Sequence, residues 1–175
     1  EPVVYQSLGI GGRISETGIK VLEVDRGGEF SSLLVIGNIV VRQLSRLGVL
    51  WETTLVDSPS IAGIWDLDGD GTLEIVTTGS RVTVLSLSTG ALLWQSEVPQ
   101  RNVRVLVDNI DSDPAMELLL FAQELGEISL YDFSEGMTPA LIRRFTSSLA
   151  APRVLSVLGD FDGDGVVDDL CRTDG

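Results

Sequence analysis

Three short segments place acidic side chains at alternate positions, an arrangement that can surround a metal ion. They read DLDGDGTLE from residue 66, NIDSDPAME from residue 109 and DFDGDGVVD from residue 160. Together they hold eleven of the 26 acidic residues, so most of the net charge of −14 is concentrated in them. Carboxylates this crowded repel one another unless a cation lies among them. Ca²⁺ suits such a loop, because it takes about six to eight oxygen ligands.

The same loop positions supply the predicted calcium ligands in each segment. Positions 1, 3, 5 and 9 offer side chains, position 7 offers a backbone carbonyl, and glycine at position 6 permits the sharp turn. The middle segment departs from this pattern, because Asn109 stands at position 1 and Pro114 replaces the glycine. The predicted ligands are Asp66, Asp68, Asp70, Thr72 and Glu74, then Asn109, Asp111, Asp113, Ala115 and Glu117, then Asp160, Asp162, Asp164, Val166 and Asp168.

Two other interpretations of these segments fail on the residues. An EF-hand needs a glutamate at position 12 between two helices, whereas Thr77 or Cys171 stands there and the flanks read as strands. A hairpin turn needs one Asp-Gly pair, and the first segment carries four acids in nine residues. The chain has no histidine, which excludes Ser-His-Asp catalysis and histidine-ligated metals.

Short apolar runs flank the acidic segments and recur with them. Glu117 follows Glu74 by 43 residues, and Asp168 follows Glu117 by 51. The runs are rich in Val, Ile, Leu and Thr and are bounded by Gly, Asn, Ser and Asp, which indicates strands. Helical periodicity is absent. In the clearest repeat the expected strands are 61–65, 73–78, 81–87 and 91–97.

Four antiparallel strands in each repeat of this length predict an all-β fold, a β-propeller of four-stranded blades. A β-sandwich does not need the same acidic loop at every fourth strand. About three blades and the start of a fourth are expected, and we expect them to continue into or pair with further blades. The predicted units are 1–17 (linker or last strand of a preceding blade), 18–58 (blade without a metal site), 59–100 (blade with a calcium loop), 101–149 (blade with a degenerate calcium loop) and 150–175 (start of a further blade with a calcium loop).

Two motifs resemble known propeller families. DLDGDGTLEIV and DFDGDGVVDDL, each after an apolar strand, resemble the calcium loops of FG-GAP/VCBS repeats, the blades of integrin-α-type propellers. That resemblance implies a propeller with an extracellular recognition or adhesion role, although the Phe-Gly and Gly-Ala-Pro elements of the family are absent. The segment from Thr89 to Trp94 resembles the tryptophan-docking motif of quinoprotein-type blades, which implies that Trp94, and similarly Trp51, packs between neighbouring blades.

These observations predict a non-catalytic calcium-binding propeller segment that recognises protein or carbohydrate. An extracellular, cell-surface or periplasmic location is expected, because extracellular calcium modules bind at about 10⁻⁴–10⁻³ M. A propeller enzyme (a calcium-dependent polysaccharide lyase or a quinoprotein-like oxidoreductase) and a structural subunit of a larger assembly are the alternatives. Nucleic acid is not an expected partner of so acidic a chain. No run approaches the 18 apolar residues of a membrane-spanning helix.

Overall fold

A computed structural model gives the fold, and the part of the chain that it describes consists of strands and their connections. In this part the strands fall into three groups of four and one pair. The backbone is described for residues 20–25, 30–37, 40–45, 48–55, 60–97, 103–111, 113–122, 125–146, 155–159 and 169–173, and most side chains are described between residues 40 and 146. Within this part, no helix has the length and hydropathy needed to cross a membrane.

Each group of strands forms one antiparallel sheet in which sequence neighbours pair. The first sheet contains β1 (Lys20–Asp25), β2 (Phe30–Gly37), β3 (Val40–Ser45) and β4 (Gly48–Thr54). The second contains β5 (Ser60–Trp65), β6 (Glu74–Thr78), β7 (Val82–Ser86) and β8 (Leu92–Gln95). The third contains β9 (Val103–Asp108), β10 (Glu117–Ala122), β11 (Glu127–Asp132) and β12 (Ala140–Thr146). The pair is β13 (Leu155–Gly159) with β14 (Asp169–Thr173).

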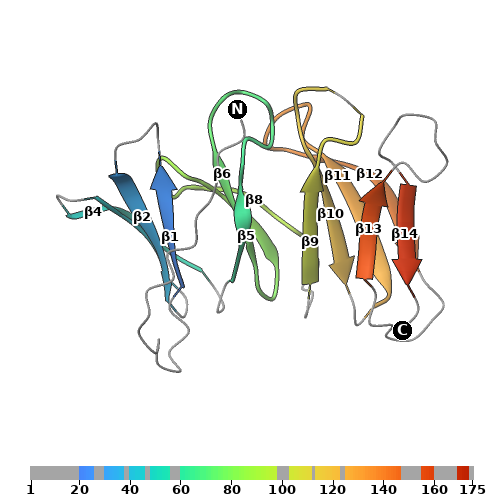
Figure 1. Ribbon diagram of the computed structural model, residues 1–175, viewed down its shortest axis with the longest axis horizontal. Coiled ribbons are helices and arrows are strands. Elements are labelled where there is room, and N and C mark those ends of the chain that lie inside the picture. Colours follow the sequence, from blue (N-terminus) through green and yellow to red (C-terminus); the bar gives the residue numbers. More distant parts are fainter. Residues whose placement is uncertain are drawn as a thin grey trace.

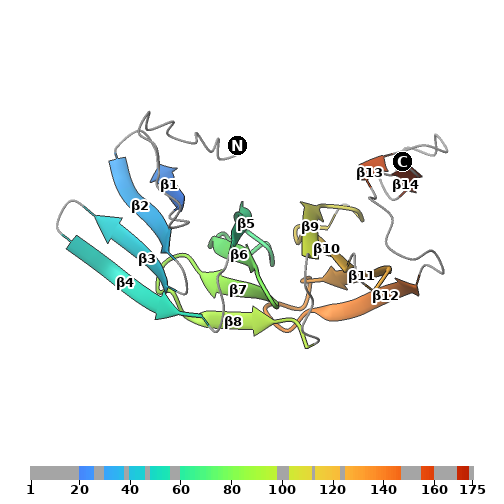
Figure 2. The same cartoon turned by 90° about the horizontal axis from the view of Figure 1, so that it is seen from below.

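The sheets are arranged in an arc as the blades of a propeller. Figure 2 shows β1, β5, β9 and β13 on the inner side of the arc and β4, β8 and β12 on the outer side. Four-stranded antiparallel sheets set around a centre in this way are propeller blades. The predicted all-β propeller fold, with three blades and the start of another, is therefore confirmed.

All three four-stranded sheets carry the same irregularity between their third and fourth strands. The pairing register shifts at the middle of the third strand, and the fourth strand has one extra residue there. A β-bulge of this kind raises the local twist of the outer strand and makes it a poorer template for edge-to-edge pairing. The shifts lie between Gln43 and Leu44, between Val84 and Leu85, and between Leu130 and Tyr131.

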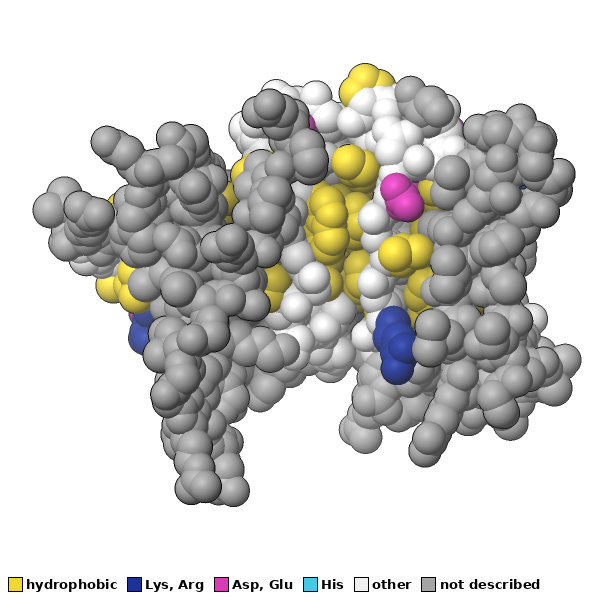
Figure 3. All heavy atoms as spheres, in the orientation of Figure 1, with side chains coloured by type: hydrophobic (Ala, Val, Ile, Leu, Met, Phe, Trp, Pro, Cys, Tyr) yellow, Lys and Arg dark blue, Asp and Glu magenta, His cyan; other side chains and the backbone are white. Residues whose placement is uncertain are grey.

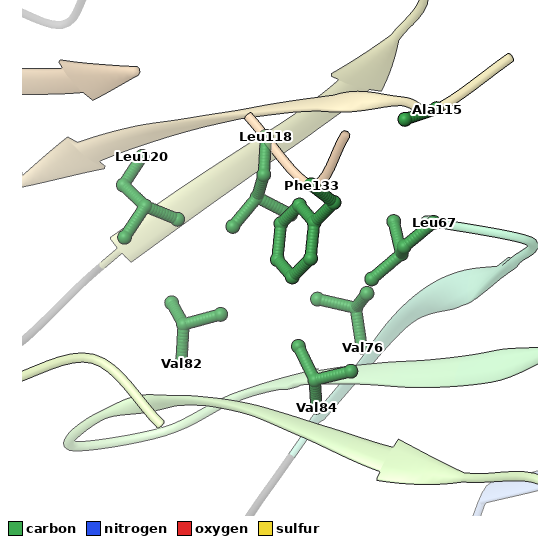
Figure 4. Packing of buried hydrophobic residues seen from close by; sticks show 8 residues of the cluster. All are labelled: Leu67, Val76, Val82, Val84, Ala115, Leu118, Leu120 and Phe133. Carbon is green, nitrogen blue, oxygen red and sulfur yellow. The ribbon is translucent and has the colours of Figure 1, made fainter. Parts of the chain in front are cut away.

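The largest core cluster lies between the second and third sheets (Figure 4). Strand β6 is buried on both faces. Ile75 packs in the cluster toward the first sheet, and Val76 packs in the cluster toward the third. This strand is therefore continuously buried instead of alternating with polar residues. The second and third sheets contribute Leu67, Val76, Val82, Val84, Ala115, Leu118, Leu120 and Phe133 to the larger cluster.

Two tryptophans on outer strands dock onto the following sheet, as their sequence motif implies. Trp51 on β4 donates its indole N–H to the carbonyl of Leu87 at 2.9 Å. Its ring covers Gly90, where a Cβ atom would lie 2.3 Å from the ring. Trp94 on β8 packs edge-to-face on Tyr131 with ring centroids 5.0 Å apart. The expectation that both tryptophans pack between blades is confirmed.

The contact between the second and third sheets extends to the inner side of the arc. In Figure 3 hydrophobic side chains gather over and between β5 and β9, with few charged side chains among them. Apolar packing between the two sheets thus reaches this face.

Candidate metal centres in two acidic loops

The connections from β5 to β6 and from β9 to β10 lie at the same end of neighbouring sheets (Figure 1). Each brings three carboxylates together. In the first loop, residues 66–74, one oxygen each of Asp66, Asp68 and Glu74 lies within 4.8 Å of the others. In the second loop, residues 109–117, one oxygen each of Asp111, Asp113 and Glu117 also lies within 4.8 Å of the others.

Glu74 anchors the first loop from the start of β6. Its side chain is 2% exposed. One carboxylate oxygen, Oε2, accepts a hydrogen bond from the backbone N–H of Leu67 at 3.0 Å, and Oε1 accepts from the hydroxyl of Thr72 at 3.1 Å. Burial raises the pKa of Glu74, and the nearby charges of Asp68 and Asp70 act in the same direction. A positive charge near this carboxylate would therefore be favourable.

Backbone N–H groups turn the other acids of the first loop. Gly71 donates its N–H to Asp66 Oδ2 at 3.0 Å, and Asp70 donates to Asp68 Oδ1 at 3.3 Å. Gly71 has a φ of +88°, a conformation that a side chain would strain. Burial is the main cause that raises the pKa of Asp68, and repulsion from Asp70 and Asp66 adds to it. These contacts keep Asp66 and Asp68 directed toward Glu74.

Asp70 is the predicted ligand that the structure places outside the group of three. Its Oδ1 accepts hydrogen bonds from the backbone N–H of Thr72 at 2.7 Å and from the Thr72 hydroxyl at 2.6 Å. These hydrogen bonds lower the pKa of Asp70. The side chain thus stabilises the turn at Thr72, and the backbone carbonyl of Thr72 stays a predicted ligand.

The second loop repeats three hydrogen bonds of the first loop at positions 43 residues later. Ile110 donates its N–H to Glu117 Oε2 at 2.5 Å, as Leu67 does to Glu74. Asp113 donates to Asp111 Oδ1 at 3.0 Å, and Ala115 donates to Asp113 Oδ1 at 2.8 Å. The buried glutamate and the Asp-x-Asp turn are therefore shared by both loops.

The second loop differs at its first and sixth positions. Pro114 has no N–H, so it cannot make the hydrogen bond that Gly71 makes to Asp66. Asn109 instead donates its amide N–H groups to the carbonyls of Asp113 and Ala115, the latter at 3.1 Å. The sequence predicted that Asn109 and Ala115 each provide an oxygen ligand. In the structure these two predicted ligands are hydrogen-bonded to each other.

Each loop contains a buried carboxylate oxygen without a hydrogen-bond partner. Among the described side chains, Asp66 Oδ1 and Glu117 Oε1 are the two such atoms, and Glu117 is 3% exposed. Burial raises the pKa of Glu117, with repulsion from Asp111 as a further cause. Buried polar atoms are nearly always paired. A cation bound by oxygen atoms would supply the missing partner in both loops, so the residues present fit a hard metal ion.

One contact that sequence reasoning missed joins the two loops. The carbonyl of Leu67 accepts a hydrogen bond from the N–H of Met116 at 2.8 Å. Beside it, a Cβ atom at Gly69 would lie 2.8 Å from the carbonyl oxygen of Pro114. Periodicity within a repeat gives no signal for contacts between repeats.

The remaining predicted sites are outside the described residues. This applies to the third acidic loop, with the predicted ligands Asp160, Asp162, Asp164, Val166 and Asp168, and to residues 26–29 of the repeat predicted to lack a metal. Both stay predictions.

Comparisons with known proteins give a likeness of structure but none of sequence. No protein-family model and no curated protein sequence matches the chain. A crystal structure of the WD40 domain of SCAP from fission yeast is similar over 90% of this chain, with 18% sequence identity and a TM-score of 0.44. The chain spans about two fifths of the length of that domain chain, since 39% of the latter is covered.

Proposed function

We propose that the chain is a non-catalytic calcium-binding propeller segment, related to FG-GAP/VCBS repeats, that recognises protein or carbohydrate outside the cytosol. The observation that carries the proposal is the buried, unpartnered carboxylate oxygen in each of two loops of matching design, Asp66 Oδ1 and Glu117 Oε1. An unpaired buried charge is costly, and a bound cation removes that cost.

The chemistry of the donors favours Ca²⁺ over other metals. Each group of three consists of carboxylates, with neither nitrogen nor sulfur. Such donors suit calcium, magnesium or manganese, whereas zinc and copper prefer imidazole or thiolate. Mg²⁺ needs nearly ideal octahedral geometry and keeps several of its waters. A nine-residue loop that offers carboxylates and backbone carbonyls is better suited to the larger and more adaptable Ca²⁺.

Apolar side chains on the outer strands support a recognition role. Val49, Leu92 and Leu141 occupy equivalent positions beside the bulge, and they are 58%, 56% and 44% exposed. Leu50 and Ile142, next to two of them, are also exposed. Apolar groups that recur on all three four-stranded sheets favour contact with another macromolecule. Calcium affinities of about 10⁻⁴–10⁻³ M, typical of extracellular modules, favour a location where calcium is abundant.

Thermal unfolding of the full chain in about 2 mM CaCl₂ and in excess EGTA tests the proposal. Binding to the folded state alone raises stability by RT ln(1 + [Ca²⁺]/Kd), about 0.7–1.8 kcal/mol for each site at such affinities. The melting temperature is therefore expected to rise with calcium and to rise less in Asp68→Asn and in Asp111→Asn. Glu135→Gln, a charge change at an exposed residue outside the loops, should keep the full effect. A folded protein whose melting temperature is the same with calcium and with EGTA would contradict the proposal.

A further inference from the structure

Two hydrogen bonds and one peptide bond connect the residues that anchor the two acidic loops. Leu67 donates its N–H to Glu74 Oε2 at 3.0 Å and accepts the N–H of Met116 on its own carbonyl at 2.8 Å. Met116 directly precedes Glu117, and Glu117 Oε2 accepts the N–H of Ile110 at 2.5 Å. Glu74 and Glu117 are thus linked through Leu67 and Met116.

Packing prevents the two loops from moving independently at this contact. The side chain of Leu67 is fully buried, in the same cluster as Ala115 of the second loop. Gly69 approaches Pro114 so closely that a Cβ atom would lie 2.8 Å from the Pro114 carbonyl oxygen. A change in the position of Leu67 is therefore transmitted to the second loop, because close-packed interiors do not absorb such shifts.

We infer that the two loops bind cations cooperatively, so that an ion in one loop raises the affinity of the other. This inference rests on the proposed calcium function. An ion that fixes Glu74 also fixes Leu67, and through the Met116 hydrogen bond it orders the residue before Glu117. The binding of the second ion then costs less conformational entropy, because part of its loop is already ordered, and this gives positive coupling. Thermodynamic linkage requires that an ion in either loop raises the affinity of the other loop by the same factor.

Simple electrostatics predicts the opposite sign, which makes the inference testable. An ion in the first loop lowers the negative potential at the second loop and would weaken binding there. Salt at physiological concentration screens this repulsion between exposed charges over about 8 Å. The hydrogen-bond route is buried and is screened much less. A variant with an empty first loop therefore distinguishes the two effects by the direction of the change.

The experiment is a CaCl₂ titration of the ¹⁵N-labelled full chain in about 0.15 M salt, followed by NMR. The backbone amides of Leu67 and Ile110 report the first and second loops separately, since each donates to the buried glutamate of its own loop. The midpoint of each amide is the calcium concentration at which half of its signal change has occurred. In Asp68→Asn, the midpoint of Ile110 is expected to rise about fivefold or more, the lower range of typical couplings. In Asp111→Asn, the midpoint of Leu67 should rise by the same factor.

A second pair of variants changes no charge. Gly69→Ala and Gly136→Ala both place a side chain at a positive φ, but only the former meets the second loop; Gly136 lies in the turn after β11, outside both acidic loops, and has no atom within 4 Å. Gly69→Ala should raise the midpoint of Ile110, and Gly136→Ala should leave it at the wild-type value. Equal midpoints in the two variants would refute the route through the loop contact.

The failures of the inference and of the proposed function are distinguishable. If Ile110 titrates at the same or a lower calcium concentration in Asp68→Asn than in the wild type, the loops bind independently and the calcium function stands. If neither amide responds to calcium in the wild-type protein, the calcium function itself fails and the inference fails with it.

Discussion

The two acidic loops of neighbouring blades share an anchor but differ in how they close. In both, a buried glutamate at the start of a second strand accepts a backbone N–H from seven residues earlier, Leu67 for Glu74 and Ile110 for Glu117. In the first loop, an aspartate at position 1 is held by the N–H of a glycine. In the second loop, Asn109 instead donates its amide N–H groups to the backbone carbonyls of Asp113 and Ala115.

This difference shows that position 6 determines what position 1 can do. Gly71 offers an N–H to the Asp66 carboxylate, whose other oxygen is left buried and free. Pro114 offers none, and an amide at Asn109 takes the carbonyl that a metal ion would otherwise use. We therefore expect the first loop to be the stronger calcium site, and we expect the second to bind through Asp111, Asp113 and Glu117, the three acids that the structure brings together.

The largest expected effect concerns the shared anchor. Glu74→Ala, measured in calcium, leaves the buried N–H of Leu67 without a partner and should cost about 1–3 kcal/mol. Glu117→Ala should cost less, because Glu117 accepts one hydrogen bond where Glu74 accepts two. Urea unfolding measures both. Glu52→Ala, at an exposed ion pair with Arg42, is the control, with a loss of about 1 kcal/mol or less. A Glu74→Ala loss no larger than this control would contradict the role of the anchor.

A smaller effect is expected from exchanging the residues at position 1. Asn109→Asp adds a carboxylate to the second loop and removes the amide that bonds the Ala115 carbonyl. Its calcium affinity should rise about tenfold, or about 1.4 kcal/mol, since ligand charge tunes such sites. Asp66→Asn should weaken the first loop similarly. Calorimetric titration of both variants measures these changes. An unchanged affinity in Asn109→Asp would show that position 1 does not account for the difference between the loops.

The smallest expected effect is a pH dependence that both loops share. Burial raises the pKa of Glu74 and of Glu117 above the ordinary value of 4.5. Without metal, their contribution to stability is therefore complete below pH 4.5 and is lost as the pH rises through the raised values. We expect calcium to bind in place of these protons. The rise in melting temperature caused by calcium should therefore grow as the pH increases through the raised pKa values.

Melting temperatures between about pH 4 and 7, of protein freed of metal beforehand and of protein with calcium, check this dependence. Glu117→Gln removes the contribution of the second loop. Without metal the wild-type protein should lose more stability than this variant as the pH rises. Equal slopes would mean that the buried charge of Glu117 carries no cost in the folded protein.

Much of the fold was predictable because it depends on local patterns. The strand expected at 73–78 forms at Glu74–Thr78, and that expected at 81–87 forms at Val82–Ser86. Short runs of β-branched residues between turn residues specify strands locally. The docking of Trp51 and Trp94 followed from their motif. The repeat then fixed the architecture, because each sheet buries its faces only against neighbouring sheets.

The details of the site were less predictable because they depend on which backbone groups are free after folding. Five ligand positions were expected in each loop, yet Asp70 turns toward Thr72 and Asn109 toward Ala115. Both side chains satisfy local backbone groups, which compete with a distant ligand. The hydrogen bond from Met116 to Leu67 crosses between repeats, so no pattern within one repeat could indicate it.

Counting the calcium ions bound by the full chain tests the central claim most directly. Calorimetric titration of metal-free protein should give two more ions per chain for the wild type than for the variant Asp66→Asn/Asp68→Asn/Asp111→Asn/Asp113→Asn, which removes two of the three carboxylates in each group. The difference is independent of any ion bound by the loop from residue 160. Equal numbers of ions in two folded proteins would show that the acidic loops of residues 66–74 and 109–117 are not calcium sites.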